Sequence, residues 1–346
     1  MYILSRLLQG IGVIWGIVTL LFVIFYALGD PTDYLVEDNA DAATRAAVRA
    51  KYGLDQPLPV RYFTYLNGLS PIGWADSAGL AQGALGLVPL RGGALALKWP
   101  DLGRSYQSQA PVGALIAARL GGTAWLGLSS LLFAALAGIP LGVAAALRRD
   151  TWADRSILTL SVLGVSAPSF FVGVLVAWLF SVVLGPWTGL PVSGYLFEEE
   201  IFGTGSRIVW AHLLLPALAL GIRPLAVLVQ LTRSSMLDVL SLDYIRSARA
   251  KGLPPRRVYW RHALRNALNP VITSLTGWLA SLLAGAFFIE YIFDWQGIGK
   301  LTIDALNTND FPVILGCAAC IGTVFVLVHV LTDLLYALTD PRIRLR

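Results

Sequence analysis

The stretch that decides the fold is DYIRSARAKGLPPRRVYWRHALRNALNP, which runs from Asp243 to Pro270. It is strongly basic within a chain that is 56% hydrophobic and only 14% charged, whereas soluble domains average about 25% charged residues. One acid accompanies its seven basic residues, which are Arg246, Arg249, Lys251, Arg256, Arg257, Arg261 and Arg265. This contrast between an apolar chain and one basic interval is typical of a membrane protein with a basic loop on one side of the membrane.

Six apolar runs are long enough to be membrane-spanning helices. A helix needs roughly 20 apolar residues to cross the hydrocarbon core, and lipid offers backbone groups no hydrogen bonds, so helices are the expected structure. The runs lie near Leu8–Leu28, Gly121–Leu147, Ile157–Leu184, Trp210–Leu231, Val271–Ile292 and Val313–Leu338. The sequence therefore predicts an all-α integral membrane protein with six transmembrane helices.

Two apolar segments need separate interpretation. The first run is preceded by Arg6 and is longer than the roughly 7–15 apolar residues of a signal peptide, so we interpret it as a retained anchor. The segment Gly79–Leu97 is interrupted by Gln82, Pro89 and Arg91. We predict that this segment does not span the membrane.

The charges of the loops predict the orientation of the chain. With six spans, residues 1–7, 148–156, 232–270 and 339–346 share one side, and they carry 15 Lys and Arg against five acids. The opposite loops carry ten Lys and Arg against 14 acids. Because loops rich in Lys and Arg stay in the cytoplasm, both termini and the basic stretch are predicted to be cytoplasmic. The net charge of +5 follows from this topology and gives no reason to expect nucleic acid as a partner.

The spacing within the basic stretch predicts more than its side of the membrane. Arg257, Arg261 and Arg265 recur every four residues and form one helical row. A second face is apolar and holds Trp260, Ala263, Leu264, Ala267 and Leu268. The sequence Gly252–Pro255 interrupts the pattern, because glycine permits positive φ and proline ends a helix. We therefore predict two amphipathic helices joined by a tight corner along the membrane surface, where they would bind anionic lipid or a cytosolic protein.

The loop resembles the cytoplasmic signature of permease subunits in ATP-binding-cassette (ABC) importers. Here the signature comprises Ser247-Ala248-Arg249, then Gly252, then Leu268 with Pro270, and Ser247 stands where the family usually has an acid. Further segments resemble the peptide/nickel/opine branch of these permeases: LTRSSMLDVLSLDYIRSARAKGL, RHALRNALNPVIT, IEYIFDWQGIGKL, NTNDFPVILG and LTDLLYALTDPRIR. Two more, YGLDQPLPVRYFTYL and DLGRSYQSQAPVGALI, are similar to the B-type subunit of oligopeptide and dipeptide permeases.

The resemblance implies a type I ABC importer permease fold with one transmembrane domain over residues 1–346. Within it, residues 30–119 would form a long extracytoplasmic (periplasmic) loop region, and residues 232–270 a cytoplasmic coupling loop. The chain would lie in the bacterial inner membrane and form the translocation pathway as a heterodimer with a second homologous permease subunit. An extracytoplasmic substrate-binding protein would deliver di- or oligopeptides, or alternatively nickel, glutathione or an opine. Two cytosolic ATP-binding subunits would supply the energy.

The resemblance also implies that the short helix around Ser247–Leu253 is a coupling helix seated in a groove of one ATPase. The predicted coupling residues are Ser247, Ala248, Arg249, Ala250, Gly252 and Leu253. Small side chains permit close approach, and arginines pair well with acids on a partner.

No catalytic constellation is recognisable in the sequence. A phosphate loop of the form G-x-x-x-x-G-K-[ST] ending at Gly299-Lys300 would need Gly at 294 and Ser or Thr at 301, but the chain has Asp294 and Leu301. We therefore predict that the chain is not an enzyme and has no cofactor of its own, with ATP bound by partner subunits. Cys317 and Cys320 lie in an apolar run without further Cys or His nearby, so helix packing is the interpretation and no metal site is predicted.

Two residues of the apolar runs are candidates for the translocation pathway. Arg223 lies in the fourth run, and an arginine within a membrane usually faces a cavity or a partner charge. Contact with substrate carboxylates, snorkelling to a membrane interface and pairing with the partner subunit are all open for it. Pro168 is expected to kink the third span. The alternative class is a gradient-driven secondary transporter, which often shows internal repeats, but the chain has no recognisable inverted repeat.

Overall fold

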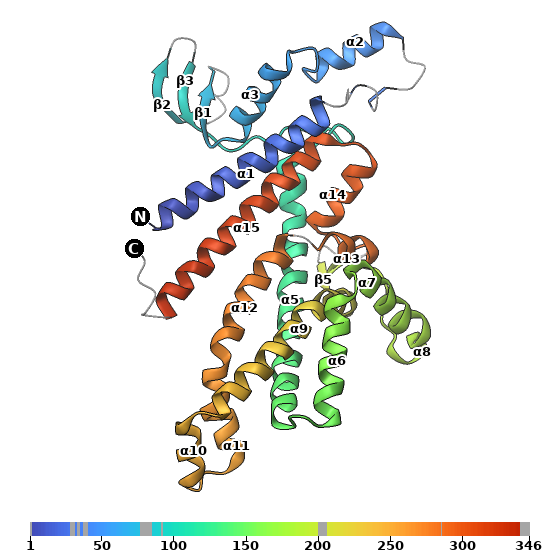
Figure 1. Ribbon diagram of the computed structural model, residues 1–346. Helices are drawn as coiled ribbons and strands as arrows, with labels where there is room; N and C mark the ends of the chain where they lie inside the picture. Colours follow the sequence, from blue (N-terminus) through green and yellow to red (C-terminus); the bar gives the residue numbers. More distant parts are fainter. Residues whose placement is uncertain are drawn as a thin grey trace. The chain divides into compact units, whose positions relative to one another are not determined.

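The computed structural model describes the chain apart from residues 1, 28–31, 33–34, 37–40, 77–84, 91–92, 200–205, 285 and 340–346. These residues pack as two compact units (Figure 1). Unit 1 comprises Met1–Leu7, Leu120–Lys300 and Val324–Arg346, and unit 2 comprises Leu8–Arg119 and Leu301–Thr323. The prediction of one functional domain over residues 1–346 stays a prediction.

Unit 1 is built almost entirely from helices. Besides the ends of three helices shared with unit 2, they are α5 (Val112–Leu147, from Leu120 on), α6 (Trp152–Ser166), α7 (Ser169–Ala177), the π-helix η2 (Trp178–Val183), α8 (Gly185–Thr188), α9 (Ala211–Leu240), α10 (Asp243–Ala250), α11 (Pro255–Arg257), the π-helix η3 (Val258–Ala263), α12 (Leu264–Ala284) and α13 (Phe287–Ile292). The strands β4 (Phe197–Glu199) and β5 (Ser206–Ile208) pair antiparallel.

Helix α9 is the central helix of unit 1 and packs against α6, α7 and α12. Glycines bring it close to α5. A Cβ added at Gly142 of α5 would lie 2.7 Å from the carbonyl oxygen of Val229, and one added at Gly221 of α9 would lie 2.8 Å from that of Ser130. Small residues suit such contacts, because lipid is as apolar as the side chains and helix association depends on close packing.

Unit 2 contains most of α1 (Tyr2–Ala27), then α2 (Ala42–Lys51) and α3 (Leu58–Leu69), and parts of α14 (Ile298–Asn307) and α15 (Phe311–Thr339). It also contains a three-stranded antiparallel sheet in the order β1-β3-β2, whose strands are Ile72–Ala75, Leu85–Leu90 and Gly93–Leu97.

The sheet corrects the all-α prediction, although the fold is mostly helical. In β3, Ala94 and Ala96 are buried, whereas Leu95 and Leu97 are exposed. This alternation is the two-residue period of a strand. The predicted non-spanning segment Gly79–Leu97 therefore contains β2 and β3, while its residues 79–84 and 91–92 lie outside the described part.

Four described helices are long and apolar enough to cross a membrane, and a bent pair makes a fifth candidate. The four are Leu8–Tyr26 of α1, α5, α9 and Phe311–Asp333 of α15. The fifth combines α6 with Ser169–Val183, which spans α7 and η2. Four or five of the six predicted spans thus have the length and composition to cross.

The third predicted span is broken rather than kinked. Helix α6 and the segment Ser169–Val183 meet at an angle of 111°, and Pro168 lies at the break with extended backbone, as does Ala167 before it. Proline donates no backbone hydrogen bond and disfavours helical conformation in the preceding residue. The run Ile157–Leu184 is therefore not one helix, and Pro168 causes a larger change of direction than predicted.

The fifth predicted span, Val271–Ile292, is also divided. Helix α12 starts earlier, inside the basic stretch, and ends at Ala284, and α13 is a separate short helix. Its first part carries Arg265, Asn266 and Asn269, which shorten the apolar length of α12.

Candidate functional site

The candidate site is the loop between α9 and α12, which Figure 1 shows as α10 and α11 close to each other. Helix α10 ends at Ala250, and Gly252 then adopts φ +74°. The backbone N–H of Lys251 donates to the backbone carbonyl oxygen of Ser247 at 3.1 Å. The backbone N–H of Gly252 donates to the carbonyl oxygen of Arg249 at 3.0 Å. Because positive φ favours glycine, the predicted corner between two helices is confirmed at Gly252.

The two faces of α10 differ in burial. Ile245 is fully buried and Ala248 almost so, in a core that includes Val143, Met236 and Val258. The remaining predicted coupling residues are exposed or half-buried, namely Ser247, Arg249, Ala250, Gly252 and Leu253. Ala248 therefore packs in the core. Ser247, Arg249 and Ala250 lie on the outer face of α10, and Gly252 and Leu253 lie in the corner that follows it.

The helix after the corner contains a π-helical segment, which corrects one sequence-based expectation. The helical spacing predicts that Trp260 lies on the apolar face with Ala263 and Leu264. Trp260 is instead 49% exposed, whereas Val258 and Ala263 are fully buried. These two buried residues are five apart, which is the hydrogen-bond spacing of a π-helix rather than an α-helix. The segment η3 therefore rotates Trp260 away from the core.

A tyrosine ties α10 to the following helix. The hydroxyl of Tyr244 donates to the carbonyl oxygen of His262 at 3.3 Å, and it accepts a hydrogen bond from Nδ2 of Asn266 at 2.7 Å. Together with the core formed by Ile245 and Ala248, these bonds attach α10 to η3 and α12. A displacement of α10 would therefore move the helices that follow it.

An ion pair that the sequence does not predict connects the turn between α5 and α6 to α9. Nε and Nη2 of Arg233 donate to the two oxygens of Asp154, each at 2.6 Å, and the Asp154 side chain is only 2% exposed. Asp154 also accepts from the backbone N–H of Asp150 at 3.0 Å. Two-pronged arginine–carboxylate pairs are strong and geometrically specific. The start of α6 is thus fixed to the part of α9 that leads into the loop.

The outer surface of the loop is positively charged. Arg246 forms an exposed ion pair with Asp243 at 3.3 Å. Among the described residues, no acid lies within ion-pair distance of the other six exposed cations, which are Arg249, Lys251, Arg256, Arg257, Arg261 and Arg265. Such a surface suits an acidic protein groove or an anionic lipid.

The two pathway candidates lie on different helices of unit 1. Arg223 is exposed on α9, beside the buried Pro224, and the described residues offer it no ion pair. Pro168 is exposed at the break after α6. Helix α6 approaches α9 nearby, since a Cβ added at Gly164 would lie 3.1 Å from Cγ2 of Ile222. Arg223 therefore points out of the unit 1 core, as both a cavity and a subunit interface would require.

A buried carboxylate organises another part of unit 1 that the sequence did not predict. Glu290 is fully buried, and its two oxygens accept from Oγ1 of Thr123 at 2.7 Å and from the backbone N–H of Lys300 at 3.0 Å. Thr123 in turn accepts from the backbone N–H of Ile298 at 2.8 Å. Burying a charge is costly unless it is hydrogen-bonded, and these bonds tie α13 and the start of α14 to α5.

Comparison of the sequence with models of protein families identifies the class of protein to which this site belongs. The model described as the binding-protein-dependent transport system inner membrane component matches residues 138–345. The model of the N-terminal part of such membrane components matches residues 1–127. The chain belongs to this transport family. It is an inner membrane permease component of the ABC transporter class, so the resemblance found in the sequence is confirmed.

Individual relatives of the permease align over nearly its whole length. It is 37% identical over 344 residues to the glutathione transport system permease protein GsiC of Salmonella typhimurium. It is also 37% identical over 364 residues to the dipeptide transport system permease protein DppB of Escherichia coli. Each alignment covers 99% of the permease and 98% of the relative. A chain of the inward-facing MetNI methionine ABC transporter aligns with a TM-score of 0.49 and 15% identity, covering 66% of the permease and 97% of that chain.

The region matched by the first family model contains the basic loop and the Asp154–Arg233 pair, whereas the Glu290 network reaches Thr123 in the region matched by the N-terminal model. Residues 138–345 include α10, the Gly252 corner, η3 and the Asp154–Arg233 pair. A binding-protein-dependent permease implies a substrate-binding protein, a partner ATPase and a second permease. The role of each coupling residue stays a prediction.

Proposed function

We propose that the chain is one of two different permease subunits that together form the translocation pathway of an ATP-driven importer of di- or oligopeptides. Two cytosolic subunits would bind and hydrolyse ATP, and an extracytoplasmic protein would deliver the substrate. The observation that carries the proposal is the exposed basic loop at α10, braced against α9 and α12, in a chain 37% identical to a dipeptide permease over 99% of its length.

The proposed topology has six spans of a type I importer permease with both termini in the cytoplasm. The apolar length of α1, α5, α9, α15 and the bent α6–α7 pair supports five of them, and α12 with α13 would supply the sixth. The excess of Lys and Arg in residues 232–270 supports a cytoplasmic position for α10. Residues 30–119 would then be extracytoplasmic.

In the proposed mechanism, α10 sits in a groove of one ATPase and moves with it. The outer face at Ser247, Ala250 and Gly252 would contact the groove, and the exposed cations would pair with its acids. When ATP closes the ATPase pair, the buried Ile245 and Ala248 and the Tyr244 hydrogen bonds would carry the displacement into α9 and α12. This is a rigid-body transition in which packed elements move as units.

Glutathione is the second candidate substrate, because GsiC is as similar to the chain as DppB. Glutathione is itself a small peptide with free carboxylates, so one pathway chemistry would serve both. The pathway candidate Arg223 would interact with such carboxylates.

Uptake into proteoliposomes tests the proposal. The permease pair, its ATPases and the binding protein would be reconstituted, and accumulation of a radiolabelled dipeptide measured with and without ATP. We expect uptake that requires both ATP and the binding protein, with unlabelled glutathione as competitor to rank the two substrates. Uptake driven by an ion gradient in the absence of the ATPases would instead establish the secondary-transporter alternative.

A further inference from the structure

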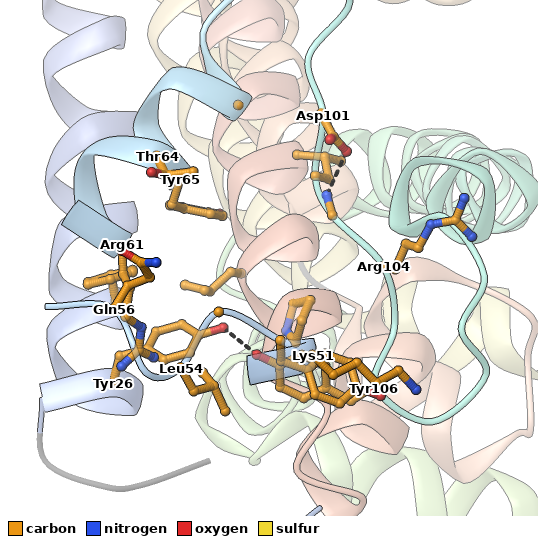
Figure 2. Close-up of a pocket in the computed structure, with 18 of the residues that line it drawn as sticks. Tyr26, Lys51, Leu54, Gln56, Arg61, Thr64, Tyr65, Asp101, Arg104 and Tyr106 are labelled. Atoms are coloured by element: carbon orange, nitrogen blue, oxygen red, sulfur yellow. Dashed lines mark hydrogen bonds between the residues drawn. The ribbon is translucent and has the colours of Figure 1, made fainter. Parts of the chain in front are cut away.

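Unit 2 contains a pocket of about 880 Å³ that the importer function does not explain. Figure 2 shows side chains from α1, from α3 and from the loop after β3 around it. All of its lining residues belong to unit 2, and in the proposed topology most of them lie in the extracytoplasmic region 30–119. Sites for small molecules typically measure roughly 300–1,000 Å³, so the pocket has the size of a ligand site.

The lining combines positive charge with phenol rings. Three cations (Lys51, Arg61 and Arg104) face a single acid, Asp101. Four tyrosines also line it, namely Tyr26, Tyr52, Tyr65 and Tyr106, together with the uncharged polar residues Gln56, Thr64 and Gln109. This chemistry favours an anion that also carries an apolar or aromatic group, since guanidinium groups bind carboxylates and rings pack on apolar surface.

Two buried polar atoms of α3 lack a partner. Nη2 of Arg61 and the hydroxyl of Tyr65 are shielded from solvent, and neither forms a hydrogen bond with the described residues. The Arg61 guanidinium lies 4.6 Å from the ring centre of Tyr26, which holds it in place without using its N–H donors. Leaving buried donors unpaired costs free energy, so these two atoms point to an acceptor supplied from outside the chain.

The Tyr65 hydroxyl is available as a donor at physiological pH. Burial raises the pKa of Tyr65 well above its usual value, so the phenol stays protonated. Arg61 and Tyr65 are four residues apart on α3 and therefore lie on the same face of the helix. A neutral hydroxyl on that face can donate to one oxygen of a carboxylate while the guanidinium donates to the other.

The wall opposite α3 is fixed before any ligand arrives. Asp310, which precedes α15, is almost fully buried and accepts from Oγ of Ser105 at 2.5 Å and from the backbone N–H of Tyr106 at 2.9 Å. The Tyr106 hydroxyl lies 3.0 Å from that of Tyr26. A preformed wall reduces the ordering cost of binding, which is typical of a ligand site.

From these observations we propose that the pocket binds a small molecule with a free carboxylate, of the size and chemistry of a short peptide, through Arg61 and Tyr65. Asp101, across the pocket from Arg61 in Figure 2, would accept from the ammonium group at the other end of such a molecule. The site is separate from the coupling loop, and only the choice of a peptide as ligand rests on the proposed function.

Equilibrium dialysis of the assembled transporter tests the site. The complex would be held in phosphatidylcholine nanodiscs without ATP or binding protein, and the probes would be radiolabelled Ala-Phe and its C-terminal amide. We expect saturable binding of Ala-Phe, with about tenfold weaker binding of the amide because a charge-assisted bond is lost. Arg61→Gln should weaken Ala-Phe binding about tenfold, and Tyr65→Phe by a smaller factor.

The matched control is Lys98→Gln, which removes one positive charge from unit 2 outside the pocket lining and should leave binding unchanged. Equal binding of Ala-Phe and its amide, equal binding by wild type and Arg61→Gln, or no binding by the wild type would each overturn the proposal. If phosphatidylglycerol in the nanodiscs displaces Ala-Phe competitively, a lipid phosphate is the preferred anion and the peptide assignment is wrong. If ATP-driven uptake is intact alongside any of these results, the pocket proposal is wrong and the proposed importer function still holds.

Discussion

Replacing Gly252 by tryptophan separates docking of the loop from folding of the chain. A Cβ built on Gly252 meets no atom within 4 Å, so the indole would project outward without a clash inside the subunit. The cost to folding is therefore the backbone strain of φ +74°, about 1–2 kcal/mol for a residue other than glycine. The substitution retains every basic residue of the loop, so the orientation of the chain should not change.

The assay is ATP hydrolysis by the reconstituted complex with and without substrate-loaded binding protein. For Gly252→Trp we expect normal membrane insertion and pairing with the second permease. Docking of the ATPase should be weak, or stimulation of hydrolysis by the binding protein should be lost, because the ring fills space that the groove needs. Gly252→Ala is the matched control, since it has the same unfavourable φ but little added bulk. It should retain most of the stimulation.

Full stimulation in Gly252→Trp, with the ATPases still bound, would refute the assignment of α10 and its corner as the docking element. That outcome would instead agree with a loop that rests on lipid, because tryptophan is favoured at membrane interfaces. Equal loss in the tryptophan and alanine variants would assign the effect to backbone strain rather than to the groove.

Three further predictions concern other parts of the chain. Replacing Arg233 by Leu should lower the free energy of unfolding by about 2 kcal/mol, because the buried Asp154 loses both of its hydrogen bonds from Arg233. Thermal unfolding of the complex measures this loss, and a second substitution, Asp154→Leu, should recover part of it. A cysteine at Asp55 should react with an impermeant maleimide from outside and one at Asp243 should not, and equal labelling of both from one side would contradict the six-span topology. Replacing Arg223 by Leu should alter uptake while the two permeases remain paired, and unchanged uptake of every substrate would exclude a pathway role.

Locally encoded features could be predicted from the sequence. The corner at Gly252 depends on the conformational preferences of glycine and proline within a few residues, and so does the position of the break at Pro168. The 111° angle at that break depends on how α7 packs against α9 and α13, which no local pattern contains. The prediction that Trp260 lies on the apolar face is wrong, because the period of 3.6 residues does not hold in the π-helix η3.

Features that join distant segments could not be predicted from one sequence. Asp154 lies 79 residues from Arg233, and Glu290 lies 167 residues from Thr123, so nothing near either acid identifies its partner. The sheet is a different case. The alternation of Ala94 and Ala96 with Leu95 and Leu97 is visible in the sequence, but the interruptions by glycine and proline were interpreted only as evidence against a span.

Cross-linking from α10 tests whether this helix docks onto an ATPase. A cysteine at Ser247, on the exposed outer face, would carry a short photo-cross-linker in the assembled transporter, and Ser234→Cys on the exposed side of α9 would serve as the control. We expect the Ser247 position to cross-link to an ATPase subunit and the Ser234 position not to, and we expect the cross-link to abolish stimulation by the binding protein. Cross-linking of the Ser247 position to lipid alone, in a complex that still hydrolyses ATP and transports, would contradict this docking.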